Sequence, residues 1–141
     1  MKIMAKQSGA GFWVLSSVII YSTLLVSCIA GPAAAQNDSA LFYLDRAGTL
    51  VAANDFSAAL IAVNKAIAAD PSLPEAYAQR GVLYGKQGKM DLAIADFNKA
   101  HQLDPKNSDI LFSLGLAYEK KGDRDKAITN YADAIGADTM N

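Results

Sequence analysis

A repeat of 34 residues constrains this chain more than any other feature of its sequence. When residues 74–107 are aligned with residues 108–141, ten positions are identical, whereas average residue usage would give about two by chance. Residues 40–73 form a more divergent copy, so three units tile residues 40–141 without a gap. The identities include Gly81 with Gly115, Tyr84 with Tyr118, Gly88 with Gly122, Ala93 with Ala127, and Ala100 with Ala134.

Each unit has the pattern of two antiparallel helices. In the second unit, Pro74 suits a first helical turn, and Gly88 suits the left-handed residue that follows a helix. A second helix is expected from about Met90 to Leu103, because Pro105 excludes the helical conformation from the residue before it. Asn54 occupies the turn of the first unit, and asparagine tolerates a left-handed conformation.

Small residues recur where paired helices must approach closely. The repeat therefore predicts an all-α fold, a right-handed α–α superhelix of three helix-turn-helix units. The small positions are Ala47, Gly81 and Gly115 in the first helices, and Ala59, Ala93 and Ala127 in the second helices.

This pattern resembles the tetratricopeptide repeat over residues 40–141, which is 102 of the 141 residues. In the third unit, Thr139 replaces the proline of the family pattern. Arg46 and Arg80 stand where the family more often has leucine, and we expect their guanidinium groups to lie in water. The second unit carries nearly the whole signature, with Tyr77, Gly81, Tyr84, Ala93, Phe97, Ala100 and Pro105.

Composition excludes several kinds of site. One Cys and one His exclude a disulfide framework, a Cys/His zinc site and a Cys-His nucleophile pair in the repeat domain. A net charge of −1 leaves no broad cationic surface for nucleic acid. His101 has no triad or metal partner at a suitable spacing and is expected to face solvent. We therefore expect no enzyme activity, no metal and no cofactor.

The first 35 residues have the order of an export signal, positive and then apolar. Lys2 and Lys6 are the only charges before Asp38, and residues 11–30 are apolar or small. Gly31-Pro32 is expected to stop a helix, and small residues follow it at the positions that a signal peptidase reads. Residues 1–35 are thus predicted to be a signal peptide that precedes a short segment, residues 36–39. The cleavage site is formed by Ala33 and Ala35, with Gln36 as the new N-terminus.

Two other fates of the leader remain open. Residues 25–28 resemble a lipobox, in which Cys28 would be lipidated, and the apolar run is long enough for an uncleaved membrane anchor. In all three cases the residues after 35 are expected beyond the membrane, so the domain would be periplasmic, secreted or tethered there.

The resemblance implies a concave groove, lined by the first helices, that binds a peptide or a segment of a partner protein. An apolar lining favours an apolar segment over a carboxylate clamp. The alternative is that these residues continue the packed core. The corresponding positions hold Leu44, Gly48, Ala78, Val82, Phe112 and Leu116.

The third unit also predicts a second surface. The sequence stops at Asn141, so a stripe of Ile128, Tyr131 and Ile135 on the last helix is expected to lack full cover. Such a stripe favours a homodimer or docking to a partner. The alternative function is therefore an accessory subunit of an envelope or secretion complex.

Overall fold

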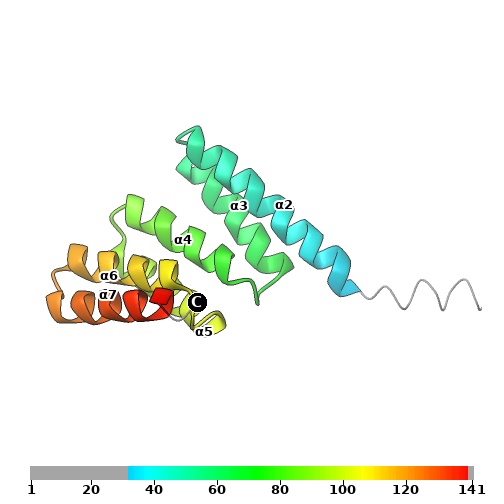
Figure 1. Cartoon of the computed structure of the whole chain (residues 1–141). Helices are drawn as coiled ribbons and strands as arrows, with labels where there is room; N and C mark the ends of the chain where they lie inside the picture. Colours follow the sequence, from blue (N-terminus) through cyan, green and yellow to red (C-terminus); the bar gives the residue numbers. More distant parts are fainter. Residues whose placement is uncertain (1–31, 140–141) are drawn as a thin grey trace, which may run out of the picture. The chain divides into compact units, whose positions relative to one another are not determined.

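Helices joined by short turns make up the computed structural model, which describes residues 32–139 (Figure 1). No strand occurs in that range, and the predicted all-α fold is confirmed. None of these helices is long and apolar enough to cross a membrane. The apolar run of the predicted leader and Cys28 lie outside the described residues. The helices are α2 (Pro32–Ala52), α3 (Phe56–Ala69), α4 (Pro74–Lys86), α5 (Met90–Leu103), α6 (Ser108–Lys121) and α7 (Arg124–Thr139).

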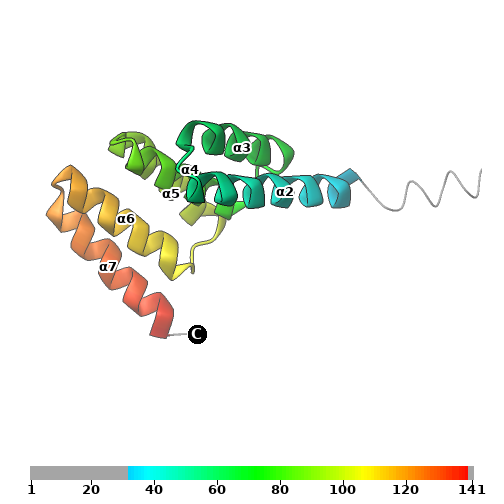
Figure 2. The same cartoon turned by 90° about the horizontal axis from the view of Figure 1, so that it is seen from above.

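Left-handed residues close the turns within the three helix pairs. Asn54 has a φ angle of 60°, Gly88 of 76° and Gly122 of 92°. The expectation that asparagine can replace glycine in the first turn is therefore confirmed. Between the pairs, Asp70 and Asp104 leave the helical conformation and end α3 and α5. Figures 1 and 2 show the resulting antiparallel pairs, with α2 beside α3 and α6 beside α7.

The start of α2 differs from the sequence prediction. Pro32 is the first residue of α2, whereas residues 36–39 were predicted only as a short segment before the repeats. Whether Gly31-Pro32 ends a preceding helix lies outside the described residues. A proline is tolerated at the first position of α2 because the first N–H groups of a helix have no partner within it. Ala33, Ala35 and Gln36 consequently lie within the first turns of α2, and residues 36–39 are helical.

The core consists of clusters that each join neighbouring helices within one compact unit, Gln36–Asn141. One cluster places Ala47 of α2 and Val63 of α3 against Leu83 of α4. Another packs Phe97 of α5 against Leu114 of α6. Since the core repeatedly crosses from one pair to the next, each helix pair is held by its neighbour. The small positions predicted for close packing are all buried, namely Ala47, Ala59, Gly81, Ala93, Gly115 and Ala127.

Candidate binding groove

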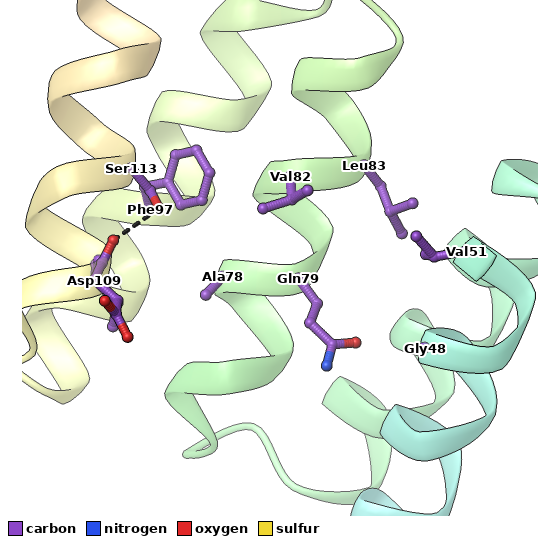
Figure 3. Close-up of a pocket in the computed structure, with 10 residues that line it drawn as sticks. Gly48, Val51, Ala78, Gln79, Val82, Leu83, Phe97, Asp109 and Ser113 are labelled. Atoms are coloured by element: carbon purple, nitrogen blue, oxygen red, sulfur yellow. Dashed lines mark hydrogen bonds between the residues drawn. The ribbon is translucent and has the colours of Figure 1, made fainter. Parts of the chain in front are cut away.

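Two adjoining hollows lie along α4. The first has a volume of about 290 Å³ and lies between α2, α4 and α6 (Figure 3). The second has a volume of about 220 Å³ and lies where α4 and α6 end. Val82, Phe97 and Ser113 line both hollows, so we treat them as one surface, the inner groove. The remaining apolar or small lining includes Gly48, Val51, Ala78, Gly85, Ile110 and Leu116.

The lining of the inner groove is largely apolar and reaches solvent. Val82 is 43% exposed and Leu116 is 41% exposed. The hydroxyl of Ser113 donates a 2.8 Å hydrogen bond to the backbone oxygen of Asp109, so this polar group is satisfied within α6 (Figure 3). A side chain added at Gly48 or Gly85 would meet no atom within 4 Å, so both glycines border open space. The groove can therefore accept an apolar group without rearranging the core.

Charges of opposite sign stand at the two ends of the inner groove. Asp109, in the first turn of α6, is the one charged residue that lines the first hollow. Lys86 and Lys120, in the last turns of α4 and α6, line the second. The ammonium group of Lys86 lies 5.4 Å from the centroid of the Phe56 ring. Within residues 32–139, no carboxylate forms an ion pair with Lys86 or Lys120.

The structure places four of the six predicted groove residues in the lining of the inner groove: Gly48, Ala78, Val82 and Leu116. Leu44 is not accessible there, because it is only 7% exposed and packs against Ala66 and Ala76.

Phe112 is not among the residues that line the inner groove. It is 57% exposed, and its ring centroid is 5.4 Å from that of Tyr131. Phe112 follows Asp109 by three residues and precedes Leu116 by four, so it borders the same face of α6. Its ring lies against Tyr131 of α7 and is not part of the groove lining. Phe112 shares a face with Glu119, seven residues later, and both contact Tyr131.

The stripe predicted on the last helix forms part of a second exposed apolar surface. Ile128 and Ile135 are 67% and 68% exposed, and Phe112 lies on the adjacent helix. The hydroxyl of Tyr131 donates a 2.7 Å hydrogen bond to Glu119, and this bond raises the pKa of Tyr131 above its usual value. We call Phe112, Ile128, Tyr131 and Ile135 the outer stripe.

The structure contradicts the prediction that the guanidinium group of Arg80 lies in water. This group makes two 2.8 Å hydrogen bonds to the carboxylate of Asp96 and one of 2.9 Å to Asn64. Asp96 is a buried charged residue on α5, and its hydrogen bonds raise the pKa of Arg80. The three side chains connect α3, α4 and α5. The signal that could have revealed them is an aspartate within the apolar face of α5, between Ile94 and Phe97.

His101 also differs from its prediction. It is half-buried rather than fully exposed to solvent, and its Nδ1 atom is buried with no hydrogen-bond partner among the described residues. It borders a hollow of about 540 Å³ beside α7 that Lys106 and Asp133 also line. No group of three or more His, Cys, Asp or Glu side chains between residues 32 and 139 could hold a metal ion.

Comparison with known proteins identifies the repeat. Residues 74–107 and residues 108–139 each match a family model described as tetratricopeptide repeat. No curated protein sequence matches the chain.

Solved structures share the fold. A crystal structure of MamA is 30% identical, with a TM-score of 0.69, over 72% of this chain and 60% of that one, so this chain spans less than two thirds of that relative. The TPR domain of Sgt2 from Aspergillus fumigatus is 25% identical, with a TM-score of 0.68, over 71% of this chain and 66% of that one. The first TPR of Spaghetti (RPAP3), bound to the HSP90 peptide SRMEEVD, is 20% identical, with a TM-score of 0.71, over 74% of this chain and 83% of that one.

Proposed function

Because this chain belongs to the tetratricopeptide repeat family, we propose that it is a non-catalytic interaction module that binds a segment of a partner protein in the inner groove. The observation that carries this proposal is the pair of adjoining apolar hollows, with Val82 and Leu116 exposed on their surface. Covering exposed apolar surface is the main favourable term in most protein association.

The fold is suited to such a partner. The related first TPR of Spaghetti (RPAP3) is bound to a peptide, which supports a peptide ligand for this architecture. The groove of this chain offers little polar recognition in its centre, since its shared residues are Val82, Phe97 and Ser113. An apolar side chain of the partner is therefore the expected anchor.

Replacing Val82 with glutamate is expected to weaken peptide binding about tenfold or more, because the anchor would have to bury a charge. Peptides are first selected from a random library against the unit 36–141, and their affinities are measured by fluorescence polarisation. Phe112→Glu is the matched control, because Phe112 is also exposed on a first helix but lies outside the lining of the groove. Circular dichroism checks that both variants keep their helices.

The two variants also separate this proposal from its alternative, docking of an accessory subunit through the outer stripe. The exposure of Ile128 and Ile135 favours that alternative. If Phe112→Glu weakened binding and Val82→Glu did not, the partner would occupy the outer stripe and the groove proposal would be abandoned. Selection of no peptide at all would also count against the groove.

We further propose that the domain acts beyond a membrane after cleavage before Gln36. The support is the order of charges and apolar residues in the leader and the small residues at Ala33 and Ala35. Intact-mass measurement of the exported protein is expected to show an N-terminus at Gln36 without a lipid. A lipidated Cys28 at the N-terminus would contradict this cleavage and indicate a tethered protein.

A further inference from the structure

We propose that the segment bound in the inner groove is extended and carries a basic residue and an acidic residue on opposite sides of an apolar anchor. This inference rests on the proposed function and adds the charge pattern of the ligand. It follows from the separation of charge along the groove, with Asp109 at the first hollow and Lys86 and Lys120 at the second.

Helix stability alone does not account for this arrangement. Acidic residues in a first turn and basic residues in a last turn do stabilise a helix. Yet the last turn of α6 holds two lysines with different surroundings. Lys121 forms a 2.6 Å ion pair with Asp91, whereas Lys120 lines the groove without a carboxylate partner among the described residues. Lys120 therefore presents an unpaired positive charge to the groove, whereas the charge of the neighbouring Lys121 is paired with Asp91.

The carboxylate of Asp109 also has no partner of opposite charge among the described residues. Within residues 32–139, no cationic side chain lines the first hollow. A partner with a basic group near Asp109 and an acidic group near Lys120 would satisfy both ends, and the reversed charge order would place like charges together. Such complementarity sets orientation and partner choice more than total affinity.

The distance between the charged ends predicts the spacing in the ligand. Asp109 and Lys120 are eleven positions apart on α6, which corresponds to about 16 Å along the helix. An extended chain advances about 3.3 Å per residue, so about five residues should separate the basic and the acidic side chains of the ligand. A helical ligand would need about eleven residues for the same distance.

A charge-swap experiment tests this inference with the peptides selected from the random library. The selected sequences should contain a basic and an acidic residue about five positions apart, with an apolar residue between them. Asp109→Lys and Lys120→Glu should each weaken such a peptide about two- to fivefold. A peptide in which the facing charge is also reversed should regain the loss. Lys99→Glu is the control for Lys120→Glu, because it changes the net charge by the same amount at an exposed site outside the groove lining.

The outcomes distinguish the charge pattern from the groove itself. If Val82→Glu abolishes binding but the selected peptides show no paired charges, or the swaps regain nothing, the groove stands and the charge inference is overturned. A spacing near eleven residues would overturn the extended conformation. If Val82→Glu has no effect, the proposed function fails together with this inference.

Discussion

Asp96→Ala is expected to lower the free energy of unfolding by about 2–4 kcal/mol, because it leaves the guanidinium group of Arg80 without its paired charge. The side chains of Arg80 and Asp96 are only 22% and 9% exposed, so water cannot fully replace the lost partner. The loss would also loosen α4 from α5, which these two residues connect. Urea denaturation followed by circular dichroism measures the change.

Lys121→Ala is the matched control for this prediction. It removes an ion pair of similar length, but the side chains of Lys121 and Asp91 are 49% and 82% exposed. Exposed pairs contribute about 0–1 kcal/mol, so this variant should stay close to the parent. Equal effects of the two substitutions would show that the Arg80–Asp96 pair contributes no more to the free energy of unfolding than an exposed ion pair does.

Gly81→Ala should destabilise the domain by about 1–3 kcal/mol through overpacking. A Cβ atom at Gly81 would lie 2.8 Å from Cε1 of Phe97, a ring that is only 5% exposed and held against α6. This cost exceeds the gain of about 0.5–1 kcal/mol that alanine usually brings to a helix interior. The same denaturation measurement applies.

The same substitution at two other glycines is expected to have a smaller or an opposite effect on stability. Gly115→Ala would bring a Cβ within 2.5 Å of Tyr131, but this ring is half-exposed and can turn outward, so the cost should be smaller than at Gly81. At Gly85 the added methyl meets nothing within 4 Å, so Gly85→Ala should stabilise the domain slightly. A cost at Gly115 larger than at Gly81 would contradict this account of how the rings are held.

Local rules were sufficient to predict much of this fold from the sequence. The helix Met90–Leu103 and the left-handed Asn54 follow from proline exclusion and from the few residues that tolerate a positive φ. The buried small residues follow from the repeat, since each must meet the same neighbour in every unit.

The repeat pattern alone could not predict which residues line the groove or which residue pairs with Arg80. Phe112 was expected in the groove because its position matches that of Ala78, but α6 directs that position towards Tyr131. The first hollow lies between α4 and α6, so it meets Ala78 and Val82 of α4 but Asp109 and Ser113 of α6, which are not equivalent repeat positions. The partner of Arg80 is 16 residues away on another helix, and no local pattern links the two.

Amide chemical shifts of the unit 36–141, measured with and without a selected peptide, locate the bound ligand on the domain. We expect the largest shifts at residues of the inner groove, such as Gly48, Ala78 and Leu116, and little change at Ile128 and Ile135. Large shifts at Ile128 and Ile135, with the groove residues unchanged, would place the ligand on the outer stripe and contradict binding in the inner groove.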